Sequence, residues 1–377
     1  MRITVLKTWC CLFLAVLMSA CGQKAQQREY ITIGALLPLT GESSDEGLRA
    51  LNGLQLAKEE INKSGGILGK MLDIIVLNDR GDEEYIVRQY HNLKERGVAA
   101  IIGSSYSNVT MALAREAERD GIPVISPTAT NPGVTKGRPN VFRAIFIDDY
   151  QAEAMAYFAY HSLGARTAVV LKNMDENSYG HITEPFIKSF TANGGHIIAV
   201  EYYAPTDDFA DILSKYAATP PDVFYCPENY VPAANLVNVA YEAGFHRTHI
   251  LGTDAWDGLL AYVLQPEAME NAYYSTPFCF DDKDEIVAQF VRSYFSSFSQ
   301  MPLTGSATAY MCVYILSEAI KKAGNTESND IVRAIKSNEL DMITGRIKFD
   351  ENNNPRQNVY ILRIKGGIYA THEKMSL

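Results

Sequence analysis

The sequence predicts an α/β protein with two parallel β-sheet lobes. Apolar runs of strand length alternate with segments whose apolar residues recur at helical spacing, which is the pattern of βα units. This alternation breaks near Asp148 and then restarts. A chain of 377 residues is also too long for one small core and suits two domains of ordinary size. We therefore expect two sheets of similar build, one on each side of the break.

The first run of βα units precedes the break. Strands are predicted at 30–37, 71–77, 99–103, 122–126 and 140–147, and helices at 46–62, 83–96 and 108–120. Glycines at 65, 66 and 69 follow a helix and precede a strand, whereas a phosphate-binding loop needs the opposite order. We interpret these glycines as a helix C-cap and a tight turn.

The second run follows the break, and the chain then ends differently. Strands are predicted at 167–173, 196–203, 223–226 and 249–252, and helices at 150–163, 179–193, 208–218 and 231–244. The ending is predicted as helices at 283–299, 306–323 and 328–337, then strands at 345–349 and 359–364. We expect this late helical block to return to the first sheet, so that several crossings between the lobes act as a hinge.

Composition excludes some classes of protein. Hydrophobic residues at 47% and charged residues at 21% are typical of a folded globular chain. The net charge of −10 argues against nucleic-acid binding, which needs a positive surface. Three cysteines lie far apart after the N-terminal region, Cys226, Cys279 and Cys312. Their spacing is neither a disulfide framework nor a zinc motif, and their apolar neighbours indicate buried thiols.

The N-terminus has the pattern of a secretory signal. Arg2 and Lys7 precede an apolar run at 8–17, which is too short to span a bilayer as a mature helix. Ser19 and Ala20 precede Cys21, a sequence that resembles a bacterial lipobox. We therefore predict a signal peptide at 1–20, lipidation of Cys21 and a polar tether at 21–29. A signal cut nearby without lipidation is the alternative.

Two hydroxyl-rich turns follow neighbouring strands of the first run. The first turn is 104–107, and the second contains Thr128 and Thr130. Open parallel sheets bind ligands at the carboxyl ends of their strands. Serine and threonine hydroxyls beside free backbone N–H groups form a good seat for a carboxylate. The alternative is that the hydroxyls only cap helices and shape turns.

Other constellations carry weaker hypotheses. His246 and His249 could form a metal pair, but metal sites need three or more converging ligands. Acidic residues could act as the paired carboxylates of an enzyme, namely Asp148, Asp149, Asp254 and Asp257. A binding site uses such charges without chemistry, so we predict no catalytic residue, metal or cofactor.

Short motifs in a fixed order carry a family resemblance. They are Ile33-Gly34 with 38–41, Ile61-Asn62 before 65–69, Ile102-Gly103 before Ser107, 126–132, Tyr179-Gly180 and Phe349-Asp350. With these motifs the chain resembles bacterial periplasmic binding proteins of type I, and within them the leucine/isoleucine/valine-binding family of ABC importers. The resemblance implies two Rossmann-like lobes joined by a three-strand hinge, with a ligand between them. It implies lobe 1 at 30–148 plus 277–355, and lobe 2 at 149–276 plus 356–377.

The resemblance also implies roles for individual residues. Ser107 and Thr130 match the positions that hold the ligand's α-carboxylate, and the carbonyl group of Thr128 matches a contact to the α-ammonium. Asp254 matches the carboxylate that pairs with this ammonium. Asp148 matches an acidic position at the crossover. The predicted ligand-binding set is completed by Tyr150, Tyr179 and Asn229. The acidic stretch 42–46 and Glu228-Asn229-Tyr230 depart from a purely aliphatic pocket.

The implied function is extracytoplasmic capture of an amino acid for an ABC importer. The expected partners are a small-molecule ligand, ABC permease subunits and the membrane that holds the lipid anchor, and the expected location is the bacterial cell envelope. Amides, urea or organic acids are alternative ligands. A lipoprotein that keeps the fold but regulates an envelope partner is the alternative class of function.

Overall fold

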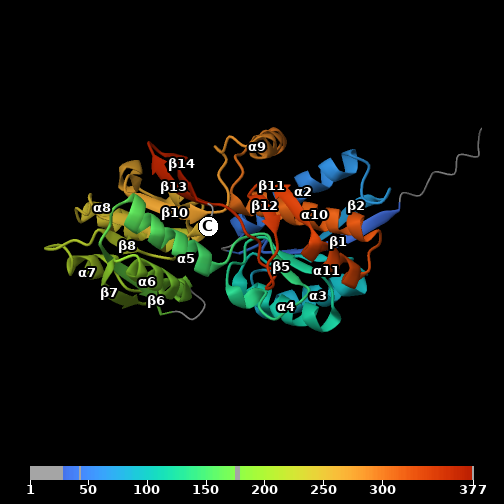
Figure 1. Ribbon diagram of the computed structural model, residues 1–377, viewed down its shortest axis with the longest axis horizontal. Helices are drawn as coiled ribbons and strands as arrows, with labels where there is room; N and C mark the ends of the chain where they lie inside the picture. The colour runs from blue at the N-terminus through green and yellow to red at the C-terminus, as the bar shows by residue number, and fades with distance from the viewer. Residues whose placement is uncertain (1–28, 42–43, 175–178, 376–377) are drawn as a thin grey trace, which may run out of the picture.

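The computed structural model describes residues 29–41, 44–174 and 179–375, and these form two α/β lobes (Figure 1). The first lobe contains a parallel five-stranded sheet in the order β2-β1-β3-β4-β5. Its strands are β1 (Tyr30–Leu37), β2 (Met71–Asn78), β3 (Ile101–Ile102), β4 (Val124–Ser126) and β5 (Val141–Arg143). The predicted fold class, two lobes with parallel-strand sheets, is confirmed.

The second lobe contains a seven-stranded sheet in the order β14-β13-β10-β9-β8-β6-β7. Its strands are β6 (Thr167–Asn173), β7 (His196–Tyr203), β8 (Val223–Tyr225), β9 (His249–Gly252), β10 (Ala272–Thr276), β13 (Val359–Lys365) and β14 (Ile368–Met375). Strands β6 to β10 pair in parallel, whereas β13 and β14 are antiparallel. The second sheet is therefore mixed, which the sequence did not predict.

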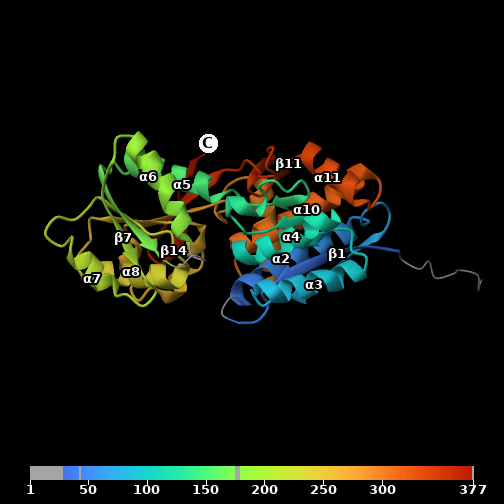
Figure 2. The same ribbon diagram turned by 90° about the horizontal axis from the view of Figure 1, so that it is seen from below.

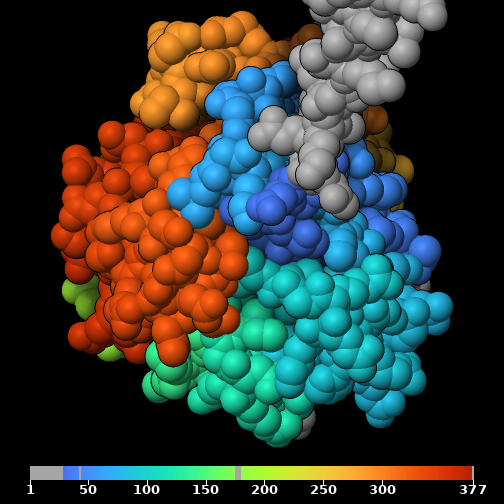
Figure 3. Space-filling view, turned by 90° about the vertical axis from the view of Figure 1, so that its right-hand side faces the viewer, coloured from blue at the N-terminus to red at the C-terminus, as the bar shows by residue number. Residues whose placement is uncertain are grey.

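Helices cover both faces of the first sheet. One face carries α3 (Glu83–Glu95) and α4 (Ser107–Asp120). The other carries α2 (Ser44–Lys63) and the late segment with α9 (Glu285–Phe298), α10 (Thr304–Ala323), α11 (Ser328–Ser337) and the hairpin β11 (Glu339–Met342) and β12 (Gly345–Lys348). Figure 3 shows this orange-red segment lying against the blue and cyan part of the chain. The prediction that the late helices return to the first sheet is confirmed.

A glycine permits the close approach of α2 and α10. A Cβ atom at Gly53 would lie 2.1 Å from the backbone oxygen of Ser306, so any larger residue would force these helices apart. Helix α10 is buried along most of its length because small and apolar residues line it on nearly all sides. This packing fixes the first turns of both helices, which lie beside the site described below.

Helices also cover both faces of the second sheet. Figure 2 shows α5 (Asp148–Tyr157) and α6 (Thr183–Ala192) on one side and α7 (Phe209–Ser214) and α8 (Tyr230–Glu242) on the other. Helix α5 begins two residues earlier than predicted and continues into the π-helix η2 (Phe158–Ser162). Short 3-10 helices complete the chain: η1 (Pro132–Val134), η3 (Tyr179–Ile182), η4 (Asp254–Trp256), η5 (Leu259–Tyr262) and η6 (Pro266–Met269).

The chain passes between the two sheets three times. The connecting stretches are 143–148, 276–285 and 349–359. Gln357 in the third stretch donates to the Ala144 carbonyl oxygen in the first at 2.7 Å, so these two connections lie side by side.

Two smaller predictions are also confirmed. Cys226, Cys279 and Cys312 are buried free thiols. Gly65 and Gly66 have positive φ angles and follow α2, where the Gly66 N–H donates to the Ile61 carbonyl oxygen as in a helix C-cap. In the described part of the chain, no helix has the length and apolarity needed to cross a membrane.

Candidate ligand site between the two lobes

A small cavity of about 60 Å³ lies where the carboxyl ends of strands from both sheets meet. The first lobe contributes the turns after β3 and β4 and the first turns of α2 and α10. The second lobe contributes the segments after β8 and β9. The described lining residues are Glu46, Ser105, Tyr106, Thr128, Asn229, Tyr230, Asp254, Ala255, Asp257, Thr304 and Gly305. This is the position at which open parallel sheets bind ligands.

The two hydroxyl-rich turns lie against each other, as the sequence predicted. The Thr128 hydroxyl donates to the carbonyl oxygen of Ser105 at 2.9 Å. The Ser126 hydroxyl donates to the carbonyl oxygen of Ser104 at 2.8 Å and accepts the N–H of Ala129 at 3.1 Å. These bonds fix the path of both turns. The Ser105 hydroxyl is buried without a hydrogen-bond partner in the described part of the protein.

Ser107 lies one residue beyond the last cavity-lining position of its turn, and Thr130 lies two residues beyond Thr128. Ser107 is the first residue of α4, and its hydroxyl accepts the N–H of Asn131 at 3.2 Å. Thr130 is buried, and its carbonyl oxygen accepts the N–H of Asp148 at 3.1 Å. Neither residue is among those that line the cavity. Their predicted contact to a ligand carboxylate stays a prediction.

A buried arginine holds the second turn in place. Arg143 on β5 donates to the carbonyl oxygens of Ala129 and Asn131 at 2.6 and 2.8 Å and to the Thr135 hydroxyl at 3.1 Å. Burial lowers the pKa of Arg143 to about 10, and Asp148 opposes this shift. An arginine with a pKa of about 10 is still charged at neutral pH, so its hydrogen bonds to these oxygens are charge-assisted.

Asp254 is held from the second lobe by one glutamine. It begins η4 just after β9, and Gln151 Nε2 donates to its Oδ1 at 2.7 Å. The same amide group donates to Asp148 Oδ1 at 2.9 Å. Asp148 is buried, and its other oxygen lies 2.7 Å from Nε2 of His181. Burial and then the nearby charge of Asp148 raise the pKa of Asp254 to about 8.

Two further carboxylates line the cavity, and neither is in the predicted ligand-binding set, although the sequence connected the acidic stretch 42–46 with the pocket. Glu46 lies in the first turn of α2, and Asp257 follows η4. Burial raises the pKa of both, and Arg49 opposes the shift in each case. Asp257 also accepts the backbone N–H of Thr304, at the start of α10, at 2.8 Å. Because Asp257 and Thr304 belong to different lobes, this bond joins the lobes beside the cavity.

The remaining predicted residues occupy different places. Asn229 lines the cavity, and its N–H donates to the buried Glu228 carboxylate at 2.9 Å. Tyr150 is not among the lining residues, and its hydroxyl donates to the Gln357 carbonyl oxygen at 3.3 Å.

Tyr179 begins η3, but its side chain lies outside the described part of the structure. Cys21 and the signal at 1–20 also lie outside the described residues, as does the tether up to residue 28.

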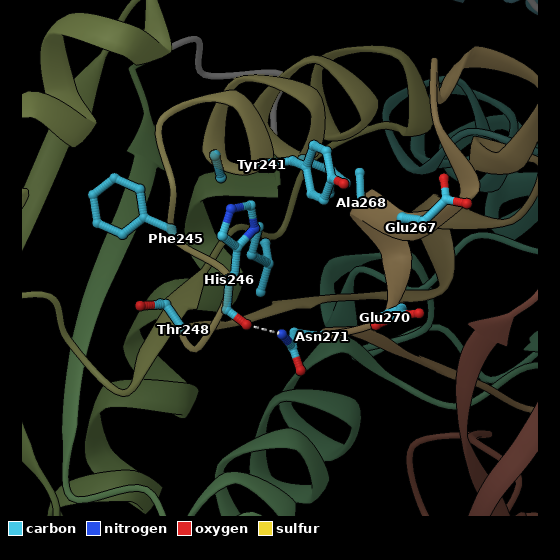
Figure 4. Close-up of a pocket in the computed structure, with 11 residues that line it drawn as sticks. Tyr241, Phe245, His246, Thr248, Glu267, Ala268, Glu270 and Asn271 are labelled. Carbon is cyan, nitrogen blue, oxygen red and sulfur yellow. Dashed lines mark hydrogen bonds between the residues drawn. The ribbon is translucent and has the colours of Figure 1, made fainter.

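A wider cavity of about 330 Å³ lies elsewhere. Figure 4 shows it in the second lobe around the end of α8 and the start of β9, lined by Tyr241, Phe245 and His246. The Asn271 amide donates to the His246 carbonyl oxygen. No residue of the predicted ligand-binding set lines this cavity, so its size does not make it the stronger candidate.

Among the described residues, no group of acidic, histidine and cysteine side chains is arranged to hold a metal ion, so the His246–His249 hypothesis gains no support.

Known proteins resemble this chain over most of its length. A Leu/Ile/Val-binding protein of Rhizobium johnstonii is 28% identical over 340 residues, which cover 85% of this chain and 88% of that protein. The crystal structure of a leucine binding protein from Thermotoga maritima matches with a TM-score of 0.83 at 29% identity, covering 92% of this chain and 99% of the other.

A second solved structure is a branched-chain amino acid transporter substrate binding protein of Streptococcus pneumoniae in complex with isoleucine. It matches with a TM-score of 0.84 at 26% identity and covers 93% of this chain and 99% of the other. The periplasmic binding protein family itself matches residues 30–368. Because that match extends over nearly all of the folded chain, the protein belongs to the periplasmic binding protein family.

Proposed function

We propose that this protein is the extracytoplasmic solute-binding component of an ABC importer and captures an amino acid between its lobes. The observation that carries the proposal is the cavity in which the hydroxyl turn of one lobe, at Ser105 and Thr128, faces Asp254 of the other. A zwitterion leaving water needs hydrogen-bond donors at its carboxylate and a negative charge at its ammonium. The relatives named for leucine, isoleucine and valine support the same class of ligand.

Lobe closure follows from this division of the ligand contacts. The carboxylate end of the ligand belongs to the first lobe and its ammonium end to the second, so a bound amino acid bridges the hinge. We place the lobe boundaries after residues 148, 276 and 355, in the stretches that join the two sheets. The proposed surround of the site then consists of Ser107, Thr130, Asp148, Tyr150 and Tyr179. Binding and release complete the task, and no chemical conversion of the ligand is proposed.

The N-terminus determines where this binding takes place. We propose a signal peptide at 1–20 and a lipid anchor on Cys21, which would hold the protein at a bacterial membrane near the permease subunits. Cys21→Ser should move the protein from the membrane fraction to a soluble or uncleaved form, because the anchor needs the thiol. Fractionation of whole cells measures this, and an unchanged membrane fraction would refute the anchor.

A thermal-shift screen tests the proposed function. The purified chain without its signal is mixed with amino acids, amides, urea and organic acids, each at the same concentration. A specific ligand present at about 100 times its dissociation constant stabilises the fold by roughly 2.7 kcal/mol. Stabilisation by an α-amino acid, but not by its amide or its desamino acid, is the expected result. Stabilisation by urea or by simple acids alone would replace the amino-acid assignment.

A further inference from the structure

Acidic side chains outnumber basic ones at the cavity between the lobes. Glu46, Asp254 and Asp257 line it, and Arg49 lies beside it. The Arg49 guanidinium group is attracted by Asp257, Glu46 and Asp45, so a single positive charge is divided among these three carboxyl groups. Isolated carboxylates are costly to bury unless a positive charge accompanies them.

A zwitterionic ligand does not change this balance. Its ammonium group offsets Asp254, but its carboxylate brings a negative charge of its own. The excess of carboxyl groups over positive charges therefore remains at Glu46 and Asp257 after a neutral amino acid binds. A ligand with an acidic side chain would make the imbalance larger. A ligand with a basic side chain would reduce it.

The cavity also offers little surface for an aliphatic side chain. Of the described lining residues, only Ala255 and Gly305 lack a polar group. Pockets that take apolar ligands are lined mainly by hydrophobic side chains. Tyr106 and Tyr230 instead provide aromatic rings, one from each lobe, and aromatic faces attract cations.

Ser105 gives an independent sign that this cavity accepts a polar group. Its side chain is only 6% exposed and its hydroxyl has no hydrogen-bond partner in the described part of the protein. Buried hydroxyl groups are almost always hydrogen-bonded. Ser105 lines the same cavity as the three acidic residues, so a ligand there would supply the absent partner.

We propose that the ligand is an amino acid with a positively charged side chain, with its second cation near Glu46. This inference rests on the proposed function, because it takes the α-amino and α-carboxylate groups as bound by Asp254 and by the hydroxyl turns. Burial raises the pKa of Glu46 and of Asp257, and Arg49 opposes the shift only in part, consistent with carboxyl groups that lack a full positive complement.

Calorimetric titration of the intact mature chain tests the charge directly, with ligand pairs of nearly equal shape. Lysine is compared with norleucine, and arginine with citrulline, at neutral pH and fixed salt. At least tenfold tighter binding of the cationic member of a pair is the expected result. Tighter binding of norleucine, citrulline or leucine would overturn the inference while leaving amino-acid binding intact. Failure of every amino acid to bind would overturn the proposed function, and this inference with it.

The variant Glu46→Gln tests whether the side-chain cation of the ligand binds near Glu46. The change keeps the size of the side chain and removes its charge, so lysine should lose at least tenfold in affinity while norleucine loses none. Glu59→Gln is the matched control, because Glu59 lies on the same helix, pairs with Lys63 and does not line the cavity, and its side chain is 59% exposed. Circular dichroism and the melting temperature verify that both variants fold. Equal losses for lysine and norleucine would overturn the placement at Glu46.

Discussion

Gln151 holds Asp254 through two hydrogen bonds of opposite direction. Gln151 Nε2 donates to Asp254 Oδ1 at 2.7 Å, and Gln151 Oε1 accepts the Asp254 N–H at 3.1 Å. The same Oε1 accepts the Ser275 hydroxyl at 2.9 Å, and the same Nε2 donates to Asp148. The amide is therefore fixed in one orientation. It aims the carboxyl group of Asp254 but brings no positive charge, which leaves that charge for a ligand to supply.

The first prediction is that ligand binding strengthens as pH rises towards 8. Burial, then Asp148, and after them Glu46 and Asp257 raise the pKa of Asp254 to about 8, while Gln151 opposes the shift. In the empty site Asp254 is therefore mostly protonated at pH 6, and a ligand ammonium must expel this proton. Affinity should rise about tenfold per pH unit below the pKa and level off above it.

Titration calorimetry from pH 5.5 to about 8.5, in buffers of different ionisation enthalpy, measures both the affinity and the released proton. The unliganded fold should show the opposite trend. Its Asp254 holds a proton that an unfolded aspartate, with a pKa near 3.8, loses, so stability should fall as pH rises from about 4 to about 8. An affinity that does not change with pH would contradict the raised pKa of Asp254.

The second prediction concerns the bond that joins the lobes. The Thr304 N–H at the start of α10 has no carbonyl partner within its own helix, and Asp257 of the other lobe accepts it at 2.8 Å. Asp257→Ala should shift the unliganded protein towards an open form and weaken ligand binding by roughly 1–3 kcal/mol. Small-angle X-ray scattering measures the radius of gyration with and without ligand.

A helix cap within one lobe provides the control for this variant. Asp82 accepts the Tyr85 N–H at 2.6 Å at the start of α3. Asp82→Ala should lower the melting temperature, because an N-cap is lost, without opening the lobes. If both variants leave the radius of gyration of the unliganded protein unchanged, the Asp257–Thr304 bond does not hold the lobes together.

The third prediction concerns one hydroxyl group from each of the two hydroxyl-rich turns. Thr128→Ala should weaken ligand binding by roughly 1–3 kcal/mol, because Thr128 lines the cavity and fixes the Ser105 carbonyl group. Ser107→Ala, for which the resemblance predicts a carboxylate contact, should have a similar effect if closure brings that hydroxyl to the ligand. Calorimetry with the best amino acid from the screen measures both.

Ser162→Ala is a suitable control for these hydroxyl variants. Its hydroxyl donates to Glu373 at 2.7 Å in an exposed position away from the cavity. Thr135 is less suitable, because it is buried and bonds Arg143 and Asn354. If Ser107→Ala and Thr128→Ala change the affinity no more than the control does, the hydroxyl turns serve only the fold.

The elements best predicted from the sequence are those whose burial produces a clear pattern. The strands β6 and β9 have the predicted bounds, because each is a largely buried run that ends at a turn residue, Asn173 or Gly252. Strand β14 was missed because polar residues at 371–374 interrupt its apolar pattern, whereas β7, at the other edge of the sheet, contains an apolar run at 197–200. Helix α7 ends at Ser214, earlier than predicted, because the residues after it form turns.

The site was harder to predict than the fold. The sequence located Thr128, Asn229 and Asp254 at turns after strands, and all three line the cavity. It did not include Glu46 and Asp257 in the ligand-binding set, because these residues meet only when α2 and η4 approach from different lobes. An unusually acidic stretch before the first helix was the available signal. Sequence spacing shows which residues follow a strand, but not which side chain of a turn faces the opposite lobe.

The last prediction uses Asp254 to separate amino acids from other ligands. Asp254→Asn keeps the size of the side chain and its ability to accept a bond from Gln151, but it removes the charge that would pair with an ammonium group. For a zwitterionic ligand the loss should exceed about 2 kcal/mol, because the ammonium group is left buried without its partner. The desamino analogue of the same ligand should lose far less, or gain. Asp149→Asn is the control, because Asp149 is an exposed carboxylate on α5 next to Asp148. It should change the affinity for neither ligand. The measurement is the calorimetric affinity of the wild type, Asp254→Asn and Asp149→Asn for the amino acid and for its desamino analogue. If Asp254→Asn weakens the amino acid and its desamino analogue equally, Asp254 does not pair with an ammonium group, and an amide or a simple acid becomes the better assignment.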